Sequence, residues 1–152
     1  MPESDSYEEV LEFAIDREID ANQFFLASAE HVDSEEMRKV FEELAQEELE
    51  HKAKLELELM KMGKTVKIRQ PPAAPQRAYI ISDNKSLLDM EYKDMLMLGI
   101  EKEEAAFRIY VNLVPNAYDS QSREVLLSLA QEEVIHKLRF QTELDIITKK
   151  HI

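Results

Sequence analysis

Two short segments, 85 positions apart, repeat the same pattern of acidic and histidine residues. The first is Leu44–Lys52, LAQEELEHK, and the second is Leu129–Lys137, LAQEEVIHK. Each segment contains a Glu-x-x-His motif, formed by Glu48 and His51 in the first and by Glu133 and His136 in the second. Residues three positions apart share one face of an α-helix, so each motif offers a carboxylate oxygen and an imidazole nitrogen together. Such mixed ligands suit iron or manganese, and zinc can compete for them.

The same offset relates a second pair of acids, Glu18 and Glu103. It also carries Ala21 onto Ala106, one helical turn beyond each acid, where a small side chain leaves room for a metal ion. All four acids interrupt stripes of mostly apolar residues spaced three or four apart, which is the pattern of a buried helix face. The second half of the chain therefore looks like a duplicate of the first, with its acids directed into the core.

Four carboxylates at one level of a core need compensation. Burying one unpaired carboxylate costs several kcal/mol, and four together would also repel one another. No Lys or Arg occupies the apolar stripes, whereas two divalent cations would balance four negative charges. One Glu from each of two helices, with a Glu-x-x-His from each of the other two, is the ligand pattern of ferritin-like dimetal proteins. The predicted metal ligands are Glu18, Glu48, His51, Glu103, Glu133 and His136.

The alternative is that these acids belong to ordinary solvated helix faces. A single Glu-x-x-His motif in so acidic a chain would be weak support for a metal site. Six ligand-type residues that share one offset and interrupt apolar stripes favour the dimetal site over coincidence.

Three neighbouring residues are candidates for supporting roles. Glu47 and Glu132 lie one helical turn before the histidines and are expected to accept the other imidazole N–H, which fixes the tautomer. A solvent-facing salt bridge is the alternative for both. Tyr110, two turns beyond Glu103, is a candidate catalytic residue, as a hydrogen-bond donor or radical sink near the metals. Its counterpart Phe25 indicates plain core packing equally well.

The elements that must position these residues are predicted from capping signals. Ser6 begins the first helix as the N-cap of a capping box, and Ser86 is expected to begin the third. Gly63 ends the second helix and Pro115 ends the third. The predicted helices span residues 6–31, 34–62, 86–113 and 119–148.

The connections between these helices indicate the topology. Short connections join the first two helices and the last two, so each pair is an antiparallel hairpin. Residues 63–85 form a long connection that can extend to roughly 75 Å, enough to run the length of the bundle. The sequence therefore predicts an all-α, ferritin-like four-helix bundle, a single domain over 1–152, made of two hairpins joined by a long crossover. A flexible interdomain linker is the alternative, but two separate hairpins could not bury their apolar faces.

Composition excludes several functional classes. The formal net charge of −13 argues against nucleic acid and anionic membrane surfaces as partners. The chain has no Cys, which removes disulfides, iron–sulfur clusters and thiol catalysis. No secretory signal or membrane-spanning run is visible, so a cytoplasmic protein is expected.

The paired Glu-Glu-x-x-His motifs and the Glu-x-x-Ala stripes resemble the rubrerythrin branch of the ferritin-like superfamily. The resemblance covers almost the whole chain and implies a di-iron centre. It implies that Glu48 and Glu133 bridge two irons, that Glu18 and Glu103 are terminal ligands, and that each histidine binds one iron. Typical rubrerythrins add a rubredoxin domain with four cysteines, which this chain lacks. They also carry an extra Glu where this chain has Ala106, so the site is closer to the symmetrical pattern of bacterioferritins.

The expected function is an oxidoreductase that reacts with hydrogen peroxide or O2 at the dimetal site. Re-reduction would need an external electron donor, such as a rubredoxin-type protein or a reductase. A homodimer is a possible assembly. One alternative is non-enzymatic iron binding, buffering or storage, although the fifth helix typical of ferritin cages is not visible. Another is a structural bundle with a vestigial site.

Overall fold

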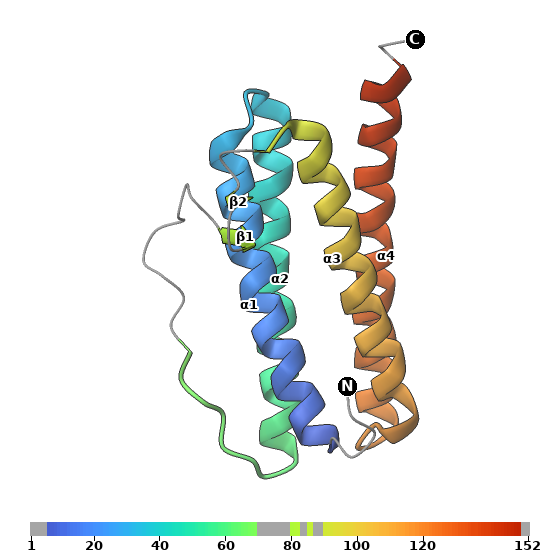
Figure 1. Ribbon diagram of the computed structural model, residues 1–152. Helices are drawn as coiled ribbons and strands as arrows, with labels where there is room; N and C mark the ends of the chain where they lie inside the picture. The colour runs from blue at the N-terminus through green and yellow to red at the C-terminus, as the bar shows by residue number, and fades with distance from the viewer. Residues whose placement is uncertain (1–5, 70–79, 83–84, 87–89, 150–152) are drawn as a thin grey trace.

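The computed structural model describes residues 6–69, 80–82, 85–86 and 90–149. Most of them lie in four α-helices: α1 (Tyr7–His31), α2 (Glu35–Lys61), α3 (Tyr92–Leu113) and α4 (Ser120–Lys149). A short 3-10 turn, η2 (Val114–Asn116), contains Pro115 and follows α3. Helix α1 packs along α2 and α3 packs along α4, and the two hairpins then pack against each other (Figure 1). This arrangement confirms the predicted all-α bundle of two antiparallel hairpins.

Side chains cap three of the four helix starts. The acceptor oxygens lie 2.7–3.2 Å from backbone N–H groups of the first turn. These pairs are Ser6 with Glu9, Ser34 with Met37, and Asp119 with Ser122. Each pair satisfies a donor that a helix start would otherwise leave without a partner. The cap positions explain why three helices begin within one residue of their predicted starts.

The third helix begins later than the sequence indicated. Ser86 does not open it; Ser86 lies in a strand, β2 (Lys85–Ser86), that pairs antiparallel with β1 (Ile80–Ser82). Helix α3 begins at Tyr92 after Glu91, which makes no side-chain cap bond. The prediction was wrong because the local capping signal at Ser86 competed with backbone pairing of Ser86 to Ile80, in a β-branched segment that favours extended structure.

The long connection leaves α2 and runs back along α1. Three of its basic residues pair with three acids that lie about one turn apart on α1. The pairs are Lys64 with Glu8, Lys67 with Glu12, and Arg69 with Asp16. At the other end of the bundle, the Met90 carbonyl lies 3.2 Å from His31 Nε2 at the end of α1. The two described ends of the connection therefore lie at opposite ends of the bundle, and residues 70–79, 83–84 and 87–89 between them lie outside the described residues (Figure 1).

The apolar core is divided into two clusters by a polar layer. The first cluster holds three packed rings, Phe25, Phe41 and Phe140, whose centroids are 5.7–6.2 Å apart. The second contains Leu11, Ile15, Leu55, Leu59, Tyr110, Leu126 and Leu129. Along each helix, the residues of one cluster are separated from those of the other by the acids and histidines predicted as ligands. The polar layer thus lies about midway along the bundle.

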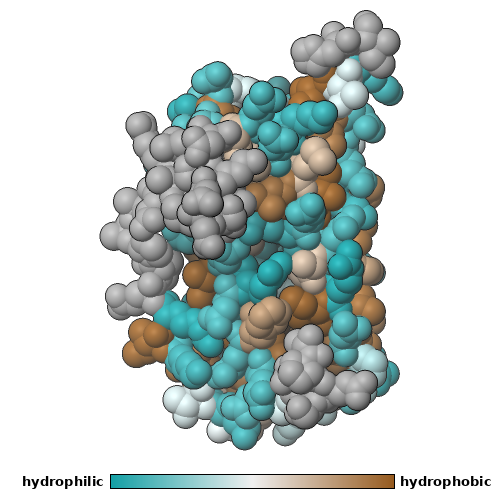
Figure 2. Space-filling view, in the orientation of Figure 1, coloured by the Kyte–Doolittle hydropathy of each residue, from teal (hydrophilic) through white to brown (hydrophobic). Residues whose placement is uncertain are grey.

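The surface of the α1 and α3 side is mostly hydrophilic, with scattered hydrophobic side chains (Figure 2). None of the described helices combines the length and the apolar composition needed to cross a membrane.

Candidate metal centre

The structure brings all six predicted ligands into the polar layer. Helices α1 and α3 each contribute one glutamate, and α2 and α4 each contribute a glutamate and a histidine. All six side chains are buried, with His136 the most exposed at 5%. Glutamate is rarely buried to this degree without a partner, so the layer requires a physical explanation.

The ligand-type atoms fall into two groups that share two members. One group consists of Glu18, Glu48, His51 and Glu133, and the other of Glu48, Glu103, Glu133 and His136. Within each group, one oxygen or nitrogen from every residue lies within 4.8 Å of the others. Each group could hold one metal ion, and the two shared glutamates lie between the two positions.

The two histidines lie side by side in this layer, one from each hairpin. Their rings are nearly parallel, with an interplanar angle of 8° and centroids 6.1 Å apart. Nδ1 of His51 lies 2.8 Å from a Glu133 oxygen, and Nδ1 of His136 lies 3.3 Å from a Glu48 oxygen. Both Nδ1 atoms therefore face the buried carboxylates of the other hairpin.

Many of these inward-facing atoms have no hydrogen-bond partner. Seven atoms of the six residues are buried and make no hydrogen bond, although each Nδ1 lies within ion-pair distance of carboxylate oxygens. They are Glu18 Oε2, Glu48 Oε1, His51 Nδ1, Glu103 Oε2, both Glu133 oxygens and His136 Nδ1. An unsatisfied buried polar atom costs roughly 1–3 kcal/mol, and more when it is charged. A pair of cations would satisfy all seven atoms at once, so the residues present fit a dimetal centre.

Burial and mutual repulsion shift the proton affinities of the layer. Burial raises the pKa of Glu48 well above its ordinary value, and the negative charge of Glu18 raises it further. Burial also raises the pKa of Glu103, against the opposing effect of His136. Burial also favours a higher pKa for Glu18, but the interactions with Glu48 and His51 outweigh burial, so the pKa of Glu18 is lowered. In the absence of a cation, burial and repulsion therefore favour the protonated forms of Glu48 and Glu103, and metal binding would compete with these protons.

Burial disfavours the charged form of each histidine, but the acids beside it have the larger effect. For His51, burial lowers the pKa, but the carboxylates of Glu18 and Glu132 together outweigh burial and raise it. For His136, the carboxylate of Glu103 has the same effect. Glu18 thus raises the pKa of His51, and Glu103 raises that of His136. These two pairs match the division of the ligands into two groups.

The outer nitrogen of each histidine contacts an acid from the other hairpin. His51 Nε2 lies 2.5 Å from Glu132, and His136 Nε2 lies 2.6 Å from Glu47. Glu47 and Glu132 were expected to accept an imidazole N–H, and the spacing of one turn suggested a pairing within each helix. The structure instead pairs them across α2 and α4, because Nε2 is the ring atom farthest from its own helix. These carboxylates are also partly solvent-facing, with 48% and 40% of their side chains exposed.

Tyr110 is placed against one candidate ligand. Its hydroxyl donates a hydrogen bond to Glu18 Oε1. Burial raises the pKa of Tyr110 well above its ordinary value, and the charge of Glu18 adds to this. The repeat counterpart Phe25 has no hydroxyl and packs in the first apolar cluster. The two halves of the site are therefore chemically different, and a catalytic role for Tyr110 stays a prediction.

Sequence reasoning missed the residues that cover the carboxylates on the α1 and α3 side. Lys102 Nζ donates to Asp20 across the two helices, at 2.8 Å, and lies 5.1 Å from the centre of the Phe24 ring. The sequence contains a signal for Lys102, because the 85-residue offset of the repeat aligns Lys102 with Arg17. Cationic residues thus recur one position before each terminal glutamate.

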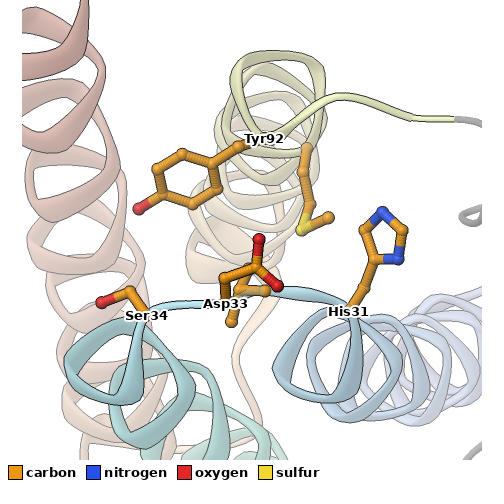
Figure 3. Close-up of a pocket in the computed structure, with 6 residues that line it drawn as sticks. His31, Asp33, Ser34 and Tyr92 are labelled. Carbon is orange, nitrogen blue, oxygen red and sulfur yellow. The ribbon is translucent and has the colours of Figure 1, made fainter.

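Another cavity lies away from this layer, at the end of the bundle. It measures about 320 Å³ and is lined by the α1–α2 turn and the start of α3 (Figure 3). Its Tyr92 side chain extends towards α4, where the hydroxyl donates to Glu143 at 3.0 Å. Among the described residues, the groups of acids and histidines that could hold a metal are the two in the polar layer, and this cavity contains neither.

Comparisons with known proteins agree with this geometry. The family model described as Rubrerythrin matches residues 9–144. A hypothetical protein from Pyrococcus furiosus has a similar structure, with a TM-score of 0.76 and 25% identity, over 95% of this chain and 91% of that one. No curated protein matches the sequence.

Ferritin-like structures show the same fold at lower identity. Two variants of PmFTN, from crystals soaked in iron, have TM-scores of 0.73 and 0.74 at 18% identity. They match over 95% and 97% of this chain, and over 89% and 91% of their own chains. These likenesses confirm the predicted ferritin-like fold.

Proposed function

Because this chain belongs to the Rubrerythrin family, we propose that it is a di-iron oxidoreductase that reduces hydrogen peroxide or O2. The observation that carries the proposal is the set of seven buried oxygen and nitrogen atoms on four helices that make no hydrogen bond. A structural bundle with a vestigial site would have no reason to keep all of these polar atoms in its core. Apolar residues of similar volume would stabilise such a bundle better.

Iron is proposed as the metal on two grounds. Carboxylate and imidazole ligands together suit iron or manganese more than magnesium or calcium, and zinc can compete. In addition, the structurally similar PmFTN variants come from crystals soaked in iron.

The ligand groups suggest how the six residues divide their work. Glu48 and Glu133 belong to both groups, so they would bridge two ions. Two further pairs would complete the separate ligand sets: Glu18 with His51, and Glu103 with His136.

The surrounding residues would keep these ligands in the required state. Glu132 and Glu47 would hold the proton on Nε2 of each histidine and leave the Nδ1 lone pair available. Tyr110 would orient Glu18 through its hydroxyl.

The proposed reaction requires two electrons and an external source for them. A bound ferrous pair would supply two electrons, one per ion, so that H2O2 takes up two protons and leaves as two waters. Cysteine-based electron relays are absent from the sequence, so re-reduction is assigned to a separate donor, such as a rubredoxin-type protein or a reductase. This donor would act after each turnover.

The test is anaerobic loading with two ferrous ions per chain, followed by rapid mixing with H2O2. We expect one peroxide to be consumed for every two ferrous ions oxidised. Glu48→Gln should lose the reaction, whereas Glu50→Gln, at an exposed position on the same helix, should retain it. Unchanged peroxide after mixing would contradict the proposal.

Iron storage is the second candidate, supported by the likeness to the iron-soaked PmFTN variants. It predicts oxidation of many more than two ferrous ions per chain under O2, with the iron retained. It also predicts a large hollow assembly, which size-exclusion chromatography separates readily from a monomer or a homodimer.

A further inference from the structure

The four carboxylates border a very small cavity between α1 and α3. Its volume is about 10 Å³, close to the least space that can admit one water molecule. Besides Glu18, Glu48, Glu103 and Glu133, it is lined by Arg17, Asp20, Ala21, Lys102 and Ala106. The two alanines provide the space, and the charged residues border it on the outer side.

One cationic side chain that lines this cavity, Lys102, makes two contacts with α1. Lys102 extends from α3 to Asp20 on α1, with an N–O distance of 2.8 Å, so the pair bridges the two hairpins. The same ammonium group lies over the Phe24 ring, 5.1 Å from its centre, which adds a cation–π contact. Only 16% of the Lys102 side chain is exposed. Two interactions thus hold Lys102 in place.

The opposite side of the bundle is more open but does not lead to the same atoms. A groove of about 510 Å³ lies between α2 and α4. Of the six candidate ligands, it is lined by His136 and by none of the four carboxylates. The carboxylate of Glu47 contacts Nε2 of that histidine. Of these two cavities, the small one between α1 and α3 is the one that borders the four carboxylates.

From this geometry we propose that the α1–α3 cavity admits the oxidant and that Lys102 limits entry to molecules the size of H2O2 or O2. Organic hydroperoxides are excluded by size. The inference rests on the proposed function and adds the class of substrate. Any hydroperoxide would accept two electrons from two ferrous ions and two protons, and its O–O bond would break to give water and water or an alcohol. H2O2 and cumene hydroperoxide thus undergo the same reaction and differ in bulk.

The first experiment compares these two oxidants on the di-ferrous protein. The wild type should react much faster with H2O2, and Lys102→Ala should raise the rate with cumene hydroperoxide by about tenfold or more. Lys102→Arg keeps the charge and the bulk, so it should retain the exclusion. Arg139→Ala, in the α2–α4 groove, is the control and should change neither rate. Equal rates of the wild type with both oxidants would overturn the inference while leaving the proposed function in place.

A second readout does not depend on catalysis. Protein loaded with Co²⁺ is titrated with azide and with benzoate, two anions of equal charge and different size, while the visible absorption of the metal is followed. Azide alone should change the wild-type spectrum, and both anions should change that of Lys102→Ala. A response of the wild type to benzoate would contradict the size limit, whatever the outcome with peroxide.

Discussion

At the level of single residues, the site depends on how each imidazole is held. Each histidine turns Nδ1 towards buried carboxylates and Nε2 towards an acid of the opposite hairpin. The outer contact selects the tautomer with its proton on Nε2, which leaves Nδ1 free to bind a metal. Glu132 and Glu47 therefore prepare the two ligands although neither faces the metal positions.

Removing one of these outer charges should weaken metal binding without dismantling the fold. We expect Glu132→Gln to reduce metal affinity by about 10–100-fold, because the amide is a weaker acceptor for the His51 N–H. A competitive titration with a chromophoric chelator measures this change. Glu50→Gln removes the same charge from an exposed position on α2 and should leave the affinity unchanged. Equal effects of the two variants would assign the loss to net charge alone.

At the level of elements, the helix ends are determined locally. Helix α2 ends in a motif in which the Lys64 N–H donates to the Leu59 carbonyl and the Gly63 N–H donates to the Met60 carbonyl. Gly63 has a φ of +77°, which residues with a Cβ adopt only with strain. This turn directs the following residues back along α1, where their basic side chains meet its acids.

A substitution at this glycine isolates the backbone contribution. An added Cβ would meet no atom within 4 Å, so Gly63→Ala introduces strain without a clash. The expected cost is about 1 kcal/mol, which lowers Tm by about 2–4 °C in a protein of this size. Gly63→Asn should cost less, since Asn tolerates this conformation better. Calorimetric melting of the two variants tests the order, and a smaller loss for Ala than for Asn would disprove it.

At the level of the whole molecule, the polar layer opposes folding unless a cation is present. It separates two apolar clusters, and within it burial and mutual repulsion disfavour the charge of Glu48 and Glu103. Both hairpins supply ligands to both groups, so bound metal would stabilise their association. Binding to the folded state alone raises stability by about 2.7 kcal/mol when the free metal is at a hundred times its Kd.

The sign of the effect of Glu48→Gln should therefore depend on metal. Without metal, the variant removes a buried, repelled carboxylate and should be more stable than the wild type by roughly 1 kcal/mol or more. With Co²⁺ in excess, the wild type should become the more stable protein, because the variant lacks a shared ligand. Thermal melting with and without Co²⁺ measures this reversal. Lower stability of the variant in both conditions would argue against a dominant electrostatic cost.

The sequence alone was sufficient for most of the fold and for bringing the candidate ligands together. Helix caps depend on residues within one turn, and the helical period places Glu48 and His51 on one face whatever surrounds them. The repeat at 85 residues then predicted that the same face recurs on the second hairpin. These features are local or periodic, so they can be predicted without knowing how the hairpins meet.

Only the tertiary structure decided which partners meet across the bundle. The pairing of His51 with Glu132, the contact of Tyr110 with Glu18 and the hydrogen bond from Lys102 to Asp20 all join residues more than 80 positions apart. The pairing of Ile80 with Ser86, which delays α3, likewise arises from backbone geometry that a capping signal does not reveal. Such contacts depend on the rotation and register of one hairpin against the other, which core packing sets and local sequence does not encode.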